Sequence, residues 1–234
     1  MKILLLGGTS ESRELAGHLQ GYDAVYSLAG ATENPAISGL STRIGGFGGV
    51  EGLRSYLRDG RFSHVVDATH PFAARMKTHV DLALAGTDVA AIHLIRASWE
   101  LDQVERVAGL TQASSVLKAG EKVFLALGSR HSETFQLRSD VQFWARSIDP
   151  KNDVGSFAYI TGKPPFSVEE ETATFQKLGI DTLVMRDSGG AEGMSKLLAA
   201  RKLGLRVVVV NRPALPHGLV VQSVKEVLQW LAAS

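Results

Sequence analysis

The chain has 234 residues, a formal net charge of +1 and no cysteine. With 44% hydrophobic and 21% charged residues, its composition is that of a globular protein and excludes a disordered chain. The near-neutral charge provides no overall field for nucleic acid or an anionic membrane, so an anionic ligand must be held by local basic clusters. Without cysteine the chain has no disulfide, thiolate metal site or cysteine nucleophile.

The apolar run near the start of the chain is too short for a secretory signal. It covers residues 3–6, and no later run reaches the roughly 18 apolar residues of a membrane span. The sequence therefore predicts a cytoplasmic protein without a membrane or nucleic-acid partner.

Short apolar runs rich in β-branched residues alternate with segments of helical period. We expect strands at residues 3–6, 24–28, 65–67, 89–95, 123–127, 141–144, 158–160, 183–185, 207–210 and 219–221. We expect helices at residues 11–19, 53–57, 72–84, 168–178, 194–203 and 224–231. Ser167 fits a helix N-cap, and Gly179 and Gly204 fit positions just past helix ends. This alternation predicts the α/β class, with doubly wound and mostly parallel sheets.

Length and pattern together predict two domains, because the chain corresponds to about 1.6 domains of typical size. The apolar pattern weakens between residues 99 and 120, so we expect domains at 1–110 and 111–234. Gly7 after the first strand is echoed by Gly128 after the strand at 123–127. Two Rossmann-like halves with a cleft between them would produce this echo. The ordinary strand–glycine–helix turn of α/β proteins explains it equally well.

Glycine-rich segments follow two of the predicted strands, at the edge where parallel sheets bind ligands. Gly7-Gly8-Thr9-Ser10 opens a helix, where backbone N–H groups attract phosphate, although it departs from the G-x-G-x-x-G pattern and also suits a tight turn. Asp187-Ser188-Gly189-Gly190 is a second candidate phosphate turn. The strand at 24–28 ends without the carboxylate that binds the ribose of NAD, which favours NADP if a dinucleotide binds.

Five arginines come directly after predicted strands. Guanidinium groups bind carboxylates and phosphates in bidentate fashion, so this placement predicts a polyanionic ligand. A solvated surface position explains any single one of them equally well. The five are Arg96, Arg130, Arg146, Arg186 and Arg212.

His70 lies at the end of the strand at 65–67, immediately before Pro71. Proline favours the first turn of a helix, so we expect the imidazole near the mouth of the crevice as a proton donor or a clamp on the ligand. A histidine that only caps the helix is the alternative. The histidines show no metal-binding spacing, and we expect no metal.

These segments, taken together, resemble the precorrin-6A reductase family of cobalamin biosynthesis over nearly the whole chain. The most specific marker is Asp67-Ala68-Thr69-His70-Pro71-Phe72-Ala73. The other markers are Gly7-Gly8-Thr9-Ser10-Glu11, Arg96 with Trp99, Gly128-Ser129-Arg130, Pro165-Phe166, Asp187-Ser188-Gly189-Gly190 and Arg212-Pro213. Two departures are Pro165, in the place where the family usually has Gly before Pro-Phe, and Arg186, where lysine is common.

The resemblance implies an NADPH-dependent oxidoreductase that reduces one double bond of precorrin-6A, a carboxylate-rich tetrapyrrole, to give precorrin-6B. As a mechanistic hypothesis, we expect catalytic roles for His70 and Arg96, with His70 either donating a proton or positioning carboxylates. Either glycine-rich turn is a candidate for the pyrophosphate, the macrocycle is either metal-free or a cobalt complex, and we expect a monomer. Cofactor contacts are expected at Gly7, Gly8, Thr9, Ser10, Gly128, Ser129, Arg130, Arg186, Ser188, Gly189, Gly190 and Arg212.

Two other classes of protein also fit parts of the pattern. An S-adenosylmethionine-dependent methyltransferase has a glycine-rich turn after the first strand of a doubly wound sheet, but it normally carries an acid after the second. A non-enzymatic binding protein for a polyanionic metabolite would explain the arginines without any reaction.

Overall fold

The computed structural model describes residues 1–30, 39–128, 133–191 and 193–234, which form two compact units. Unit 1 consists of Met1–Ala97 together with Pro213–Ser234, and unit 2 consists of Ser98–Arg212. The chain therefore passes twice between the units. No helix of the described residues is long and apolar enough to cross a membrane.

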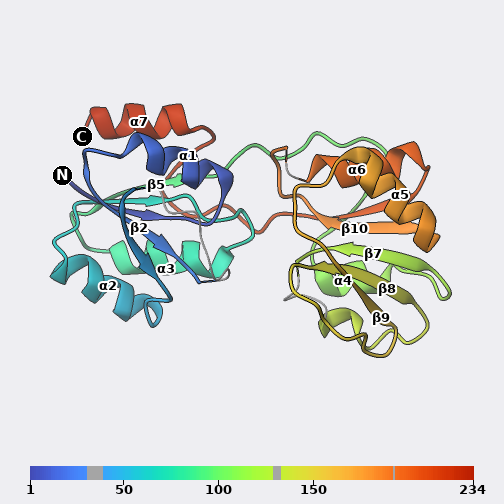
Figure 1. Cartoon of the computed structure of the whole chain (residues 1–234). Helices are drawn as coiled ribbons and strands as arrows, with labels where there is room; N and C mark the ends of the chain where they lie inside the picture. The colour runs from blue at the N-terminus through green and yellow to red at the C-terminus, as the bar shows by residue number, and fades with distance from the viewer. Residues whose placement is uncertain (31–38, 129–132, 192) are drawn as a thin grey trace. The chain divides into compact units, whose positions relative to one another are not determined.

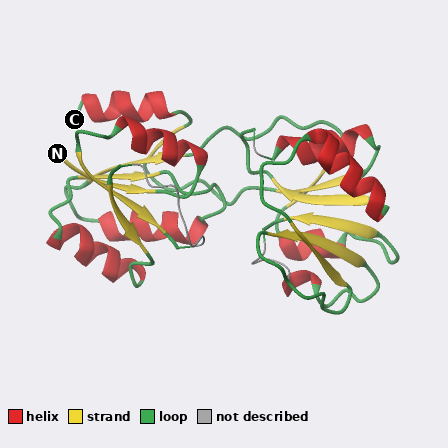
Figure 2. Ribbon diagram, viewed as in Figure 1, coloured by secondary structure: helices red, strands yellow, loops and turns green. Residues whose placement is uncertain are grey.

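Unit 1 is a six-stranded sheet with helices on both faces (Figures 1 and 2). All its strand pairs are parallel, and the strand order is β12-β5-β4-β1-β2-β3. Its elements are β1 (Lys2–Leu6), α1 (Ser10–His18), β2 (Asp23–Leu28), β3 (Ser41–Ile44), α2 (Gly49–Asp59), β4 (His64–Asp67), α3 (Ala74–Leu84), β5 (Ala90–Leu94), β12 (Leu219–Val221) and α7 (Val224–Ala232).

Unit 2 is a second all-parallel sheet of six strands, in the order β6-β11-β10-β7-β8-β9. Its elements are β6 (Glu105–Val107), α4 (Leu110–Ser115), β7 (Lys122–Ala126), the 3₁₀ helix η1 (Glu133–Phe135), β8 (Gln142–Ser147), β9 (Phe157–Thr161), α5 (Val168–Leu178), β10 (Thr182–Arg186), α6 (Met194–Lys202) and β11 (Arg206–Val210).

The two sheets have the same strand arrangement, which confirms the predicted α/β class with two doubly wound parallel sheets. β1 and β7 occupy the same position in their sheets: β1 lies between β2 and β4, and β7 lies between β8 and β10. In both sheets the direction of winding reverses at this position. The sequence echo around Gly7 and Gly128 therefore falls at equivalent places. The sixth strand of each sheet breaks the equivalence, because β12 reaches unit 1 from the end of the chain and β6 precedes β7.

The alternation of side chains along β1 explains why helices cover both faces of the first sheet. Ile3 and Leu5 pack with α1 and α7, whereas Leu4 and Leu6 pack with α2 and α3. Figure 1 shows these two pairs of helices on opposite faces of the sheet. All four side chains are at most 2% exposed. A strand that is apolar on both faces is stable only between two helical layers, as the sequence predicts.

In unit 2, apolar side chains again fill both sides of the sheet. Phe124 of β7 packs with Phe175 of α5, with their ring centroids 4.9 Å apart. Farther along the sheet, Phe143 of β8 lies 5.6 Å from the ring of Phe135 and 4.7 Å from that of Phe157. Burial of these rings provides much of the packing energy of the unit.

The helix ends follow the predicted capping chemistry. Ser167 and Glu170 form a capping box at the start of α5, and Gly179 closes that helix in the left-handed conformation, with φ +63°. Gly204, with φ +67°, lies just past α6. The helix predicted from residue 72 begins two residues later, at Ala74.

The division of the chain differs from the expected boundary near residue 110. Unit 2 begins at Ser98, because β6 pairs with β11 in the second sheet and α4 belongs to the same unit. The sequence pattern revealed neither of these two short elements. Residues 213–234 belong to unit 1, because β12 pairs with β5. Sequence position alone could not indicate this return, since a strand pattern does not specify its partner.

The cap of α7 provides a direct test of how the returning segment stabilises unit 1. The Ser223 hydroxyl accepts a hydrogen bond from the backbone of the first turn. Ser223→Ala is expected to lower the free energy of unfolding of unit 1 by about 1 kcal/mol. Fluorine NMR of fluorotryptophan at Trp230, the tryptophan of α7, follows that unfolding in urea.

Ser234→Ala is the matched control, because this exposed hydroxyl bonds to the other end of the same helix. Its effect should stay within about 0.5 kcal/mol. Equal losses in the two variants would contradict the role of the cap.

Candidate functional site

Unit 1 has a pocket of about 670 Å³ at the carboxyl ends of β1, β2, β3 and β4. Its apolar walls include Leu28, Phe47 and Met76, and its polar groups include Ser27 and Thr69. Glycines contribute much of the remaining lining. The full set of lining residues is Leu6, Gly7, Gly8, Ser27, Leu28, Ala29, Gly45, Gly46, Phe47, Gly48, Gly49, Thr69, His70, Ala73, Arg75, Met76 and His79.

The first glycine turn has its shape fixed by contacts within unit 1. A Cβ atom on Gly7 would lie 2.1 Å from a ring carbon of Tyr26, so only glycine fits there. Gly8 has φ +124° and open space where a side chain would project. The backbone N–H groups of Gly8 and Thr9 donate to the Ser12 hydroxyl, each at 3.0 Å. The glycines therefore leave this wall of the pocket without side chains, while the hydrogen bonds to Ser12 fix the geometry of the turn.

Thr9 joins this turn to the neighbouring strand end. Its side chain caps α1 by accepting from the Ser12 N–H, and its hydroxyl donates to the Ala68 carbonyl at 2.9 Å. Ser10 is the first residue of α1, and its hydroxyl donates to Glu11 at 3.2 Å. Two of the predicted cofactor residues thus have structural partners in unit 1.

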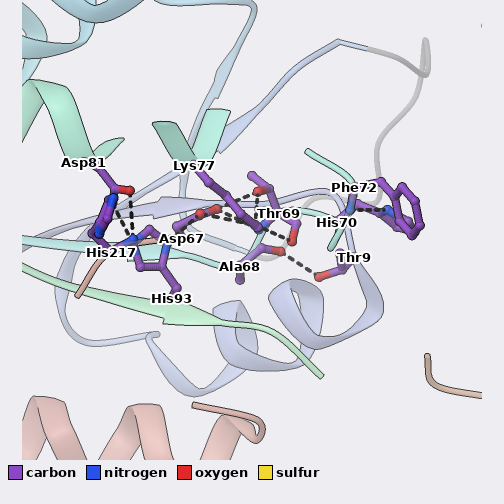
Figure 3. A network of polar contacts seen from close by, with 10 residues as sticks. All are labelled: Thr9, Asp67, Ala68, Thr69, His70, Phe72, Lys77, Asp81, His93 and His217. Atoms are coloured by element: carbon purple, nitrogen blue, oxygen red, sulfur yellow. Dashed lines mark hydrogen bonds and ion pairs between the residues drawn. The ribbon is translucent and has the colours of Figure 1, made fainter. Parts of the chain in front are cut away.

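Asp67, at the end of β4, is the centre of a buried polar network (Figure 3). Its Oδ1 accepts hydrogen bonds from the Thr69 N–H at 3.0 Å and from the Thr69 hydroxyl at 2.6 Å. Its Oδ2 contacts Lys77 Nζ at 3.3 Å and His93 Nδ1 at 2.9 Å. Lys77 also donates to the Thr69 hydroxyl at 2.9 Å. The network fixes the segment that leads from β4 into the pocket.

The ionisation of Asp67 follows from these contacts. Burial would raise the pKa of this carboxyl, but the hydrogen bond from His93, the charge of Lys77 and the hydrogen bond from Thr69 outweigh burial and lower the pKa to about 2. Asp67 is therefore a carboxylate at neutral pH, as its buried cationic partner requires.

His70 directly follows Thr69 and lines the pocket, as the sequence predicts for a residue at this strand end. Its Nδ1 accepts a hydrogen bond from the Phe72 N–H at 3.2 Å, so in the neutral ring the proton is on Nε2. The structure thus gives His70 a local bond at the start of the following turn and, at the same time, a place in the pocket wall.

Unit 2 has a pocket of about 370 Å³ at the equivalent edge of its sheet, at the ends of β7, β8, β9 and β10. Three cationic side chains, Arg146, Arg186 and Lys196, line it beside aromatic rings. Gly128 and Ser188, predicted to bind the cofactor, also belong to its wall. The remaining lining residues are Trp99, Phe124, Leu125, Ala126, Ser147, Ile148, Gly162, Pro164, Phe166, Met185 and Gly193.

A buried carboxylate, Glu171 of α5, holds two of these cations. Its two oxygens accept from Arg146 at 3.0 and 2.8 Å, and Lys196 Nζ lies 3.3 Å away. The Arg146 guanidinium also lies 3.6 Å from the centroid of the Phe166 ring. Burial lowers the pKa of Arg186. Among the described residues that line this pocket, three are cationic and none is acidic.

The second glycine-rich turn is organised by Asp187. Burial would raise the pKa of Asp187, yet hydrogen bonds from Ser98, Arg106 and Trp99 and the charge of Arg212 lower it. The indole N–H of Trp99 donates to the Gly190 carbonyl at 2.9 Å. Gly189 and Gly190, with φ +66° and +70°, form the turn beside the pocket and are not part of its wall.

The predicted arginines have different surroundings. Arg96 NH1 lies 2.9 Å from Glu11 on α1, and Arg212 Nε donates to the Asp187 carbonyl at 2.8 Å. Burial would raise the pKa of Glu11, but hydrogen bonds from its own backbone and from Arg96 lower it. Ser129 and Arg130 lie outside the described residues.

Sequence reasoning missed several residues of these sites. Arg75 and His79 line the unit 1 pocket from α3, and the glycines of Gly45-Gly46-Phe47-Gly48-Gly49 follow β3. The dense glycines after a strand were a readable signal, but β3 itself was hidden, because Ile44 is its sole strongly apolar residue and is exposed. The buried cluster of Asp67, Lys77 and His93 left no signal in the sequence pattern.

Chemically, both pockets suit anionic ligands. Among the described residues that line them, none is acidic. Within the described part of the chain, no group of three or more His, Asp or Glu is arranged to hold a metal ion. Fold and pockets together define a protein of two Rossmann-like units, each with an anion-compatible pocket at the switch point of its sheet.

Comparisons with known proteins identify the family. The family model described as "Precorrin-6x reductase CbiJ/CobK" matches residues 2–232. Precorrin-6A reductase of Rhodobacter capsulatus is 39% identical, over 99% of this chain and 96% of that protein. Cobalt-precorrin-6A reductase of Priestia megaterium is 30% identical, over 98% and 97%. A solved structure, "CobK precorrin-6A reductase", has a TM-score of 0.91 and 38% identity, covering 100% of this chain and 97% of that one.

The chain belongs to the precorrin-6x reductase family. It is accordingly an oxidoreductase of the kind that acts on a CH–CH group.

The depressed pKa of Asp67 predicts how stability depends on pH. With a pKa of about 2 when folded and about 3.8 when unfolded, Asp67 stabilises the fold above pH 4, and this contribution disappears as the pH falls towards 2. Between pH 5 and pH 2, the wild type should therefore lose about 2 kcal/mol more unfolding free energy than Asp67→Asn.

The comparison cancels the other carboxylates, which titrate in both proteins. Urea unfolding of unit 1, followed by fluorine NMR at Trp230, measures how the free energy of unfolding depends on pH in each protein. Parallel pH dependences in the two proteins would show that Asp67 is not ionised through these contacts.

Proposed function

We propose that this protein reduces one double bond of precorrin-6A to give precorrin-6B, with NADPH as the reductant. Membership of the family supports the reaction, and the relative named precorrin-6A reductase, at 39% identity against 30% for the cobalt-precorrin-6A reductase, favours the metal-free macrocycle. NADPH-dependent reduction fits a cytoplasmic location.

The pocket of unit 1 is the proposed NADPH site. It lies at the switch point of the sheet, beside the start of α1, where dinucleotides bind in doubly wound folds. Its volume of about 670 Å³ and its apolar walls suit an adenosine group. Gly8 lets the phosphate-bearing part of the ligand approach the backbone, since open space lies where a side chain would be.

The polar groups of this pocket favour NADPH over NADH. β2 ends at Leu28, and none of the described residues that line the pocket offers a carboxylate for a ribose diol. Arg75 and His79, in contrast, add positive or proton-donating groups from α3. This arrangement suits the 2′-phosphate that distinguishes NADPH from NADH.

The pocket of unit 2 is the proposed anchor for the carboxylates of the macrocycle. Arg186 and Lys196 supply charge, and Phe166 and Trp99 supply flat apolar surface, a combination that fits a conjugated ring bearing acidic side chains. Arg146 acts mainly in holding the pocket, because Glu171 already occupies both of its terminal nitrogens.

When bound, NADPH supplies the hydride, so the residues of the protein mainly position and shield the ligands. Thr69 and His70 line the unit 1 pocket. Because Nδ1 of His70 accepts from the Phe72 N–H, the neutral ring carries its proton on Nε2. His70 is proposed to position or protonate the ligand there. Arg96, held by Glu11, is proposed to bind a substrate carboxylate when one is present.

Matched substitutions at equivalent positions test which pocket holds which ligand. Ala29 and Ile148 are exposed, line their pockets, and are the first residues after β2 and β8. Ala29→Glu should weaken NADPH binding at least about tenfold, or 1.4 kcal/mol, and affect NADH much less, because the new carboxylate repels the 2′-phosphate. Ile148→Glu should instead raise the KM for precorrin-6A.

Ala29→Gln and Ile148→Gln are the neutral controls and should leave both affinities within about threefold, since they add bulk without charge. Titration of NADPH and NADH by fluorescence gives the affinities, and oxidation of NADPH with precorrin-6A gives the turnover. Loss of NADPH binding in Ile148→Glu alone would reverse the assignment of the pockets. Wild-type protein that binds S-adenosylmethionine and neither nicotinamide would overturn the proposed reaction.

A further inference from the structure

His93 and Asp81 extend the Asp67 network away from the pocket (Figure 3). His93, on β5, is 2% exposed, and its Nε2 lies 3.2 Å from Asp81 Oδ1 on α3 while its Nδ1 faces Asp67. Both ring nitrogens thus face carboxylate oxygens. They can donate to both carboxylates together only when both are protonated.

His93 has polar partners on two neighbouring elements. Asp67 and Asp81 are the carboxylates that face His93, from β4 and α3, and Lys77 of α3 is the cation that faces Asp67. These contacts bring two carboxyl groups, one ammonium group and one imidazole together in a largely buried cluster. A buried charge without a partner is strongly destabilising, so each member depends on the others.

The outer end of the network holds the segment that brings the chain back from unit 2. The backbone N–H of His217 donates to Asp81 Oδ2 at 3.0 Å. His217 lies just before β12, which pairs with β5, the strand of His93. A continuous series of contacts therefore runs from this returning segment, through Asp81, His93 and Asp67, to Thr69 in the pocket wall.

We propose that His93 and Asp81 are positioning residues, which act through Asp67 to hold the Thr69 and His70 segment in the geometry that binds the nucleotide cofactor. Asp67 Oδ1 holds the Thr69 N–H and hydroxyl, while its Oδ2 is held by His93 and Lys77. Without His93, Oδ2 of Asp67 keeps only the contact with Lys77 among these two partners, and the carboxylate can rotate away from Thr69. The inference rests on the proposed NADPH pocket of unit 1 for its effect on binding, and on geometry alone for its effect on Thr69.

Two substitutions of His93 separate positioning from packing. His93→Leu keeps the bulk of the ring but has no donor, whereas His93→Asn is smaller and keeps an N–H near the position of Nδ1, towards Asp67. If packing dominates, Asn is the more harmful change, because it leaves a cavity. If the hydrogen bond to Asp67 dominates, Leu is the more harmful change at Thr69.

Hydrogen exchange of the Thr69 amide is the first measurement, made on the whole chain without ligand. His93→Leu and Asp81→Ala should exchange this amide at least tenfold faster than the wild type, and His93→Asn should remain within about threefold. NADPH affinity should fall at least fivefold in the same two variants, with the KM for precorrin-6A unchanged within twofold. Val227→Ala, in the buried core on the α1 and α7 face of the sheet, is the control for general loss of stability and should change none of these quantities.

The outcomes distinguish the inference from the proposed function. Faster exchange at Thr69 with unchanged NADPH affinity would support the positioning network and contradict the assignment of NADPH to unit 1. Equal exchange rates of the Thr69 amide in His93→Leu, His93→Asn and the wild type would overturn the inference. It would also be overturned if Val227→Ala accelerated this exchange as much as His93→Leu does.

Discussion

Parallel pairing of β1 with both β2 and β4 is the constraint on which the unit 1 site depends. It brings the carboxyl ends of all the strands to one edge and opens a crevice where the winding reverses. The loops after β1, β2, β3 and β4 line one pocket, although they are far apart in the sequence. β7, with β8 and β10 on its two sides, imposes the same constraint on unit 2.

Each unit reinforces its crevice with one fully buried carboxylate. Asp67 holds Lys77 and His93, and Glu171 holds Arg146 and Lys196. The two arrangements differ in what they present to a ligand. Around Asp67 the cations point inward and fix a backbone segment, whereas around Glu171 the cations themselves line the pocket. The unit 1 pocket therefore combines glycine backbone with Arg75 and His79 from α3, whereas the unit 2 pocket has the cations held by Glu171 in its own wall.

Much of the fold could be predicted from the sequence, because buried parallel strands are short, apolar and β-branched whatever their surroundings. Edge elements such as β3 and β6 escaped, since Ser41–Ile44 and Glu105–Val107 carry few apolar side chains and owe their strand conformation to a neighbour. Glycine turns and His70 were predictable from their place after strands. Arg75, Lys77 and Glu171 were not, because their roles depend on which helix face meets which strand end, and helical period alone does not specify that.

The return of residues 213–234 to unit 1 sets the order in which the chain can fold during synthesis. Unit 2 is continuous from Ser98 to Arg212, so its six strands are all available before the last residues leave the ribosome. In unit 1, β5 is synthesised early but remains an open edge strand until β12 has been synthesised. Unit 1, whose other five strands precede unit 2 in the sequence, is thus completed after unit 2, and a chain cut before β12 would expose β5 as an edge strand, unpaired on the side away from β4.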